Sequence, residues 1–152
     1  MRSFFTLGRL LFVVLFLVSG LAKLSDMSAT AQTISAKVKL PELLTPYLTQ
    51  LEAASSMTWP TLAALAAGLI EVLCAIMIAF NLGARWFAMI LIVFVAVATF
   101  YFHDFWNLAG AERTANLVHT LKNLSLIGGL FMIVAWRDQM PAPVVDNNPY
   151  GD

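Results

Sequence analysis

Four long apolar segments divide the chain, and most polar residues lie between them. The segments cover about residues 4–24, 61–80, 85–102 and 117–136. Each approaches the roughly 20 residues that a helix needs to cross a bilayer. Lipid offers no partner for backbone N–H and C=O groups, so spanning segments are expected to be helical. The pattern therefore predicts an all-α membrane protein built as a bundle of four transmembrane helices.

The long connection between the first and second spans carries a shorter helical pattern. Its apolar residues recur at intervals of three and four, the spacing of one helix face: Leu40, Leu43, Leu44, Tyr47, Leu48 and Leu51. The opposite face is too polar to cross a membrane. We expect an amphipathic helix over residues 40–51 that lies on the membrane surface or caps the bundle.

Composition supports the membrane interpretation and narrows the function classes. Only 12% of the 152 residues are charged, against about 25% in soluble domains, so the bilayer is the natural solvent for this chain. The net charge is zero, which argues against a nucleic-acid partner. We expect one membrane domain over residues 1–136 and a mobile, proline-containing tail over residues 137–152.

Ionisable residues inside the apolar segments are the candidates for function, because a charge at bilayer depth costs at least about 2.5 kcal/mol. Glu71 lies near the middle of the second span. Arg9 and Lys122 lie roughly 7 Å from the midplane at about 1.5 Å of rise per residue. We expect Glu71 to bridge to Arg9, to Lys122 or to both.

These residues predict a charged pocket inside the membrane. Two positive groups against one negative leave room for an electron-rich guest: an anion, a lipid head group or a quinone carbonyl. His119 shares a helix face with Lys122. The predicted ligand-binding set is Arg9, Glu71, His119, Lys122 and Asn123, and the predicted pocket rim is Lys23, His103 and Asp104. The alternative is that the ion pairs only fix the register of the helices.

Several chemistries lack the residues that they need. The two histidines have no cysteine or carboxylate at ligand spacing, so we expect no metal site. No glycine-rich phosphate loop and no nucleophile elbow occurs, so we expect no catalytic residue. Cys74 is the single cysteine, which excludes an intramolecular disulfide relay.

The polar residues inside the apolar runs resemble the pattern of the DoxX family of small four-helix bacterial membrane proteins. The stretches that carry the resemblance are "GRLLFVVLFLVSGLAKL", "GLIEVLCAIMIAFNLGAR", "FYFHDFW" and "HTLKNLSLIGGLFMI". The matching residues are Arg9, Lys23, Gly68, Glu71, Gly83, Arg85, His103, Lys122, Asn123, Gly128 and Gly129. The resemblance implies a subunit of a quinone oxidoreductase or a membrane partner of redox and sulfur-handling enzymes.

Three functions remain open at this point. The first is a subunit that binds a quinone or small anion and serves a redox partner, at most as part of a quinone-linked oxidoreductase. The second is a non-catalytic accessory or anchoring subunit of a larger complex, or a homo-oligomer. The third is a small-anion transporter, which one four-helix unit without an inverted repeat supports less well. We expect a multi-pass protein of a bacterial inner membrane, with cytoplasmic termini.

Overall fold

The computed structural model describes residues 2–136. All regular secondary structure in this part of the chain is helical, and it contains no strand. The predicted tail over residues 137–152 lies outside the described residues. The elements in chain order are α1 (Arg2–Ser25), α2 (Met27–Lys37), η1 (Glu42–Leu44), α3 (Thr45–Ser55), α4 (Trp59–Ala79), α5 (Ala84–Phe102), η2 (Phe105–Asn107) and α6 (Gly110–Ala135). Here η denotes a short 3-10 helix.

The four long helices are α1, α4, α5 and α6, and each is long and apolar enough to cross a membrane. The predicted fold class and the order of the four spans are therefore confirmed. The first three spans begin and end within two residues of the predicted limits. The fourth begins seven residues earlier, at Gly110 instead of residue 117. Its first two turns are polar, so hydrophobicity alone does not reveal them.

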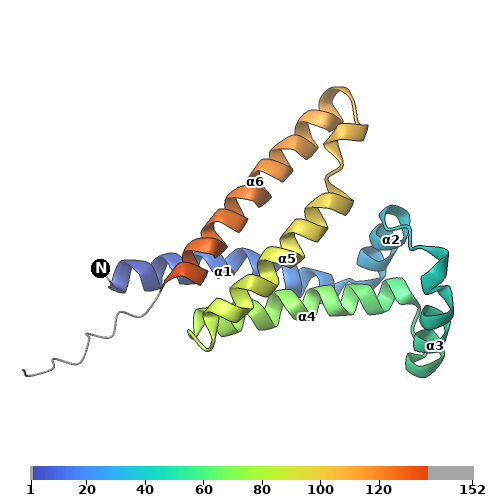
Figure 1. Cartoon of the computed structure of the whole chain (residues 1–152), viewed down its shortest axis with the longest axis horizontal. Coiled ribbons are helices and arrows are strands. Elements are labelled where there is room, and N and C mark those ends of the chain that lie inside the picture. The colour runs from blue at the N-terminus through green and yellow to red at the C-terminus, as the bar shows by residue number, and fades with distance from the viewer. Residues whose placement is uncertain (1, 137–152) are drawn as a thin grey trace, which may run out of the picture.

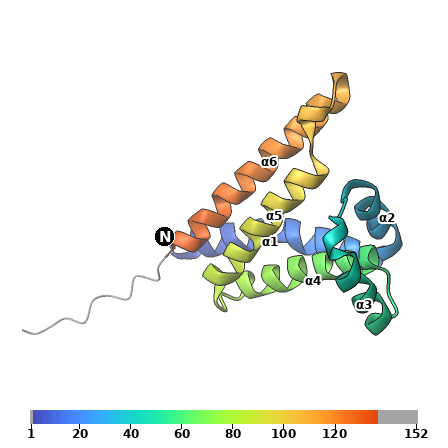
Figure 2. The ribbon, with the colours of Figure 1, turned by 45° about the vertical axis from the view of Figure 1, so that its right-hand side comes forward.

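The four long helices form two antiparallel pairs that diverge from a common end. Helices α1 and α4 lie side by side along most of their length, and α5 and α6 form the second pair (Figure 1). The pairs meet near the N-terminus and near the short turn between α4 and α5, and they separate toward the opposite end (Figures 1 and 2). We call the meeting end the terminal side and the open end the loop side.

Small residues set the close approach of α1 to α4. A Cβ atom added at Gly20 would lie 2.9 Å from the carbonyl oxygen of Gly68 and 2.8 Å from a methyl group of Val72. A Cβ atom added at Gly68 would lie 2.7 Å from the side chain of Leu24. Contacts of this kind between small residues are the usual means by which membrane helices pack closely.

The second pair joins the first through a small core at the terminal side. Leu91 of α5 and Leu130 of α6 are fully buried there, together with Phe16 of α1 and Ile78 of α4. The ring of Phe12 packs directly against Gly129, because a Cβ atom added at Gly129 would lie 2.6 Å from a ring carbon of Phe12. Within α6 the buried residues are Leu130 and Ile133, both near its C-terminal end. Its N-terminal half therefore contacts α5 but lies away from α1 and α4.

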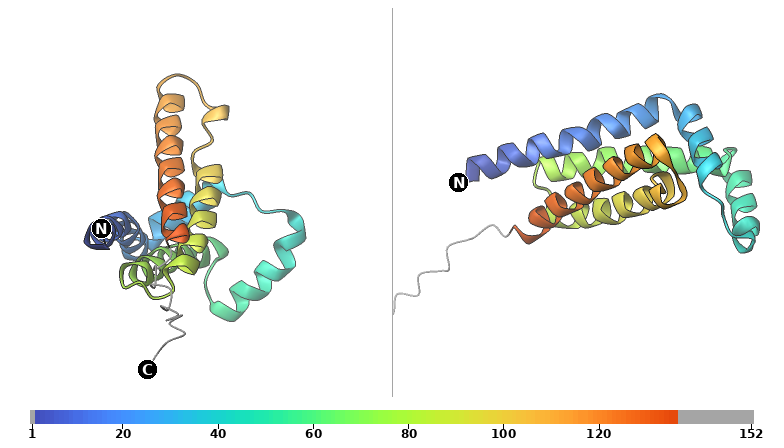
Figure 3. Two further views of the ribbon diagram at one scale, coloured as in Figure 1. Left: turned by 60° about the vertical axis from the view of Figure 1, so that its left-hand side comes forward. Right: turned by 90° about the horizontal axis from the view of Figure 1, so that it is seen from above.

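The connection between α1 and α4 contains two helices where the sequence predicted one. Asp26 ends α1 and caps α2 by accepting a hydrogen bond from the backbone N–H of Ala29 at 2.9 Å. Helix α2 packs against α4 and buries Ala31 and Ile34 around Ala64. The predicted amphipathic helix over residues 40–51 begins later, with η1 and then α3. The end view shows that α3 stands away from the four long helices (Figure 3).

The predicted apolar face of α3 lies on the surface of the structure. Leu43 and Tyr47 expose 81% and 69% of their surface, so they do not pack on the bundle. The Glu52 carboxylate ties α3 to α4 by accepting a hydrogen bond from the Trp59 backbone N–H at 2.7 Å. Leu48 and Leu51 line a groove together with Trp59 of α4. The two predicted placements, on the membrane surface or against the bundle, both stay predictions.

Candidate functional site

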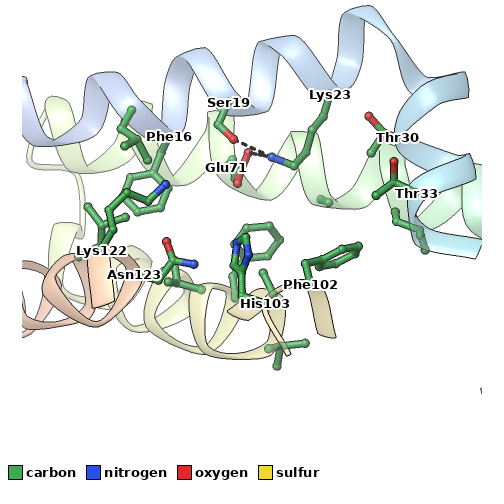
Figure 4. Close-up of a pocket in the computed structure, with 18 of the residues that line it drawn as sticks. Phe16, Ser19, Lys23, Thr30, Thr33, Glu71, Phe102, His103, Lys122 and Asn123 are labelled. Carbon is green, nitrogen blue, oxygen red and sulfur yellow. Dashed lines mark hydrogen bonds and ion pairs between the residues drawn. The ribbon is translucent and has the colours of Figure 1, made fainter. Parts of the chain in front are cut away.

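A cavity of about 520 Å³ lies between the two helix pairs, at the level where they separate. We call it the central cavity. Side chains of α1 and α4 form one wall, side chains of α5 and α6 form the other, and α2 contributes Thr30 and Thr33 at one end (Figure 4). Its polar or charged lining residues are Ser19, Lys23, Thr30, Thr33, Glu71, His103, Lys122 and Asn123. The remainder of its lining is apolar and includes Phe16, Phe94, Phe102 and Leu126.

The first wall carries an ion pair between Lys23 and Glu71. The Lys23 Nζ donates to Glu71 Oε2 at 2.9 Å and to the Ser19 hydroxyl oxygen at 2.7 Å. Glu71 is the one charged residue that is fully buried in the described chain, with 5% of its surface exposed. The Lys23 side chain is less buried, at 29% exposed. The carboxylate is therefore neutralised inside the protein by its own chain.

The helix contact described above explains why these two residues meet. Lys23 follows Gly20 by three residues on α1, and Glu71 follows Gly68 by three residues on α4. Residues three apart lie on one helix face. Glu71 lies directly opposite Gly20, because a Cβ atom added at Gly20 would lie 2.9 Å from the Glu71 Cβ atom. Lys23 shares the helix face of Gly20, one turn further along α1, and its long side chain reaches back to the carboxylate at 2.9 Å.

The predicted bridge from Glu71 to Arg9 or Lys122 is wrong. Arg9 lies at the terminal side, where its Nη1 donates to Asn81 Oδ1 at 2.6 Å. Lys122 does line the central cavity, but its ammonium group makes no ion pair with Glu71. Lys23, predicted at the rim, holds the central position instead. The position of a residue along its own helix does not give the offset between neighbouring helices, and this offset decides which side chains meet.

The second wall carries Lys122 without a partner. Within residues 2–136, the Lys122 ammonium makes no hydrogen bond and no ion pair. Asn123 beside it lines the cavity and donates from Nδ2 to the Thr99 hydroxyl oxygen at 2.9 Å. This bond links α6 to α5 and fixes the amide. Lys122 is therefore the group on this wall that is free to bind a guest.

The two histidines stack on each other at the loop-side end of the cavity. Their ring centroids lie 5.0 Å apart with the planes 16° from parallel. His103 lines the cavity, and its Nδ1 lies 3.2 Å from Asn116 Oδ1. His119 is exposed and does not line the cavity, which differs from its predicted place in the pocket. Its register on α6 turns it toward His103 and away from α1.

Asp104, the remaining predicted rim residue, lies just after α5 on the loop side. It accepts a hydrogen bond from Lys37 Nζ at 3.3 Å, which joins the end of α2 to the end of α5. Ser19, Thr30 and Thr33 line the cavity and were not predicted as site residues. The Thr30 and Thr33 hydroxyls donate to the backbone carbonyls of Asp26 and Ala29 one turn earlier, as many threonines in helices do, so the sequence does not mark them as site residues.

One of the three comparisons with known proteins gave a match, and it identifies the family. The DoxX family model matches residues 4–104. The chain belongs to the DoxX family. The match covers the Lys23–Glu71 wall of this DoxX protein and ends before α6, which carries Lys122 and Asn123. Searches of the curated proteins and of the solved structures gave no match.

Proposed function

We propose that this DoxX protein binds a membrane quinone in the central cavity and serves a redox partner as a membrane subunit. The observation that carries the proposal is that the Lys122 ammonium has no partner on one wall of the cavity, whereas Lys23 and Glu71 form an ion pair on the other wall. The proposal places the protein in a bacterial inner membrane, with both termini in the cytoplasm and one membrane domain over residues 1–136.

The charges around the cavity favour an electron-rich guest. Lys23 and Glu71 neutralise each other, so Lys122 leaves one uncompensated positive charge among the lining residues. An ammonium group has three donors, and here all three are available. A charge without a partner in a membrane interior is costly. A carbonyl or anionic oxygen that enters the cavity would relieve this cost.

The apolar lining favours a ring over a small hydrophilic anion. Phe16, Phe94 and Phe102 contribute aromatic surface to the cavity. Its volume of about 520 Å³ lies within the roughly 300–1,000 Å³ of small-molecule sites. An inorganic anion would leave most of this space and all of this apolar surface unused. A quinone head group combines a flat apolar ring with carbonyl acceptors, and its tail can remain in lipid.

Quinone binding to the purified full-length protein in nanodiscs tests the proposal. A short-chain quinone is titrated and its bound fraction measured after rapid separation, for the wild type and for Lys122→Met. A lost hydrogen bond to a charged group is worth about 1.5–3 kcal/mol, so we expect binding to weaken by about 10- to 100-fold. Lys39→Met, which removes a lysine outside the cavity, is the matched control and should bind as the wild type does.

Two results would contradict quinone binding. One is equal affinity in the wild type and Lys122→Met. The other is an inorganic anion that binds more tightly than the quinone and displaces all of the bound quinone. This result would favour the small-anion alternative.

A second candidate function is a non-catalytic accessory subunit, and the exposed face of α3 favours it. Leu43 and Leu51 expose 81% and 51% of their surface on the loop side. If these residues contact a partner protein, Leu43→Ser with Leu51→Ser should release a partner that purifies with the wild type at fixed stoichiometry. The quinone content would then be low in both proteins.

A further inference from the structure

We infer that a second site, for a phosphate group, lies at the terminal side of the molecule, at the opposite end from the loops. A cavity of about 200 Å³ is enclosed there by α1, the turn between α4 and α5, the start of α5 and the end of α6. We call it the arginine site. Its lining includes Phe5, Arg9, Asn81, Arg85, Trp86 and Trp136. It is separate from the central cavity and shares no lining residue with it.

The arginine site contains two guanidinium groups and no carboxylate. Arg9 and Arg85 both line it, and no lining residue is acidic. The acidic residues of the described chain lie elsewhere: Asp26, Glu42, Glu52, Asp104 and Glu112 at the loop side, and Glu71 in the central cavity. Neither arginine makes an ion pair within residues 2–136. Within residues 2–136, the two positive charges at this end therefore have no counter-charge.

Arg9 is held in place but is only partly satisfied. Its Nη1 donates to Asn81 Oδ1 at 2.6 Å, and its guanidinium carbon lies 5.9 Å from the centroid of the Phe5 ring. Asn81 adopts a left-handed conformation with φ of 59° in the turn after α4, which fixes its side chain locally. The Arg9 Nε is buried and has no hydrogen-bond partner. A buried donor of a charged group without an acceptor costs free energy, and an anion would remove this cost.

The start of α5 supplies further donors at the same place. Gly83 precedes the helix with φ of 63° and provides no side-chain cap. The backbone N–H groups of Ala84 and Arg85 make no hydrogen bond within the described chain. Free N–H groups and the positive end of the helix dipole favour an anion at a helix N-terminus. Ala84 and Arg85 both line the arginine site.

A phosphate group fits this combination of donors. Arginine presents a planar fork of donors that suits phosphate oxygens, and its charge persists at every physiological pH. Two such forks and two backbone N–H groups can satisfy several oxygens of one tetrahedral group. Trp86 and Trp136 beside the site are typical of the membrane–water boundary. The phosphate can therefore belong to an anionic lipid head group or to a free phosphate in solution.

The experiment has two arms that separate these sources. Full-length protein in phosphatidylcholine nanodiscs is titrated with inorganic phosphate by calorimetry, and the titration is repeated with 20% phosphatidylglycerol. Native mass spectrometry measures the phosphatidylglycerol that the protein retains. If the ligand is a lipid head group, phosphatidylglycerol is retained and abolishes phosphate binding. If it is free phosphate, saturable binding persists in both nanodiscs.

Two variants and one control connect the result to the arginine site. Arg85→Gln and Arg9→Gln should each weaken retention or binding at least tenfold. Arg85 is exposed and has no partner within residues 2–136, so its substitution tests the site without disturbing the fold. Arg113→Gln, on the loop side, should leave both readouts unchanged. The inference is overturned if neither phosphate source binds the wild type, or if Arg85→Gln binds as the wild type does.

Discussion

The two walls of the central cavity each carry a lysine, and the two lysines differ in their partners. Lys23 on the α1–α4 wall is bound to Glu71 and Ser19 at 2.9 and 2.7 Å. Lys122 on the α5–α6 wall has no hydrogen bond or ion pair within the described residues. The first wall belongs to a closely packed helix pair, whereas α6 lies apart from α1 over its N-terminal half. The same residue type therefore stabilises one helix pair and remains available for a ligand on the other.

This difference teaches that an intramembrane charge is not by itself a functional signal. A buried ion pair can be satisfied entirely within the chain, and its removal then changes stability. An unpaired charge in a cavity contributes little to the fold, and its removal then changes binding. The substitutions below test this division between the walls.

The largest effect is expected from Lys23→Met, because it leaves the buried Glu71 without its partner. Breaking a buried pair costs about 3–5 kcal/mol, and we expect about 3 kcal/mol because the Lys23 side chain is 29% exposed. The free energy of unfolding is measured by denaturant titration in detergent. Glu71→Gln should cost less, about 1.5 kcal/mol, because Lys23 is partly exposed. An equal loss of unfolding free energy for both substitutions would contradict this explanation, which depends on Glu71 being more buried than Lys23.

The second effect concerns the helix contact that aligns the pair. Gly20→Ala places a Cβ atom 2.9 Å from the Gly68 carbonyl oxygen, so α1 and α4 must separate. Overpacking of this kind costs about 1–3 kcal/mol. Gly128→Ala is the matched control, because no atom lies within 4 Å of its added Cβ. The control should stabilise α6 by up to about 1 kcal/mol, measured by thermal unfolding, and a comparable loss in both variants would contradict the packing argument.

The third effect tests the link between α5 and α6. Asn123→Ala removes the hydrogen bond to the Thr99 hydroxyl, and we expect a loss of about 1 kcal/mol. Thr99→Val removes the same bond from the other side. If the bond is the cause, the double variant should lose little more than either single variant in a double-mutant cycle. Fully additive losses would indicate that the two residues act independently.

The smallest effect on stability is expected from Lys122→Met, the substitution that should most affect quinone binding. The unfolding free energy should stay within about 0.5 kcal/mol of the wild type or rise, because a charge without a partner is removed. A loss above about 1 kcal/mol would mean that Lys122 supports the fold. The comparison between the two walls would then fail.

Much of the fold follows from the sequence because the apolar runs are long and clearly bounded. Four spans of about 20 residues leave few alternatives in a bilayer, and their order is fixed by the chain. The start of α6 was missed because its first turns, which contain Glu112 and Arg113, are polar. Helix α2 was missed because it is rich in alanine, serine and threonine and buries only Ala31 and Ile34.

The candidate site was only partly predictable for a geometric reason. Glu71, Lys122, Asn123 and His103 could be selected because polar residues in apolar runs are conspicuous, and all four line the cavity. Their partners depend on how far one helix is displaced along the next and on the divergence of the two pairs. Those quantities arise from contacts such as Gly20 with Gly68, which hydrophobicity does not encode. Arg9 was therefore assigned to the wrong site.

Within residues 2–136, the acidic residues are placed unevenly between the two ends of the molecule. Outside the central cavity, the terminal side of the described chain carries arginines and no carboxylate, while the loop side carries Asp26, Glu42, Glu52, Asp104 and Glu112. A transmembrane voltage acts on each elementary charge with about 2.3 kcal/mol per 100 mV. A voltage negative on the side of the N-terminus therefore pulls Arg9 and Arg85 toward that side and the carboxylates away from it.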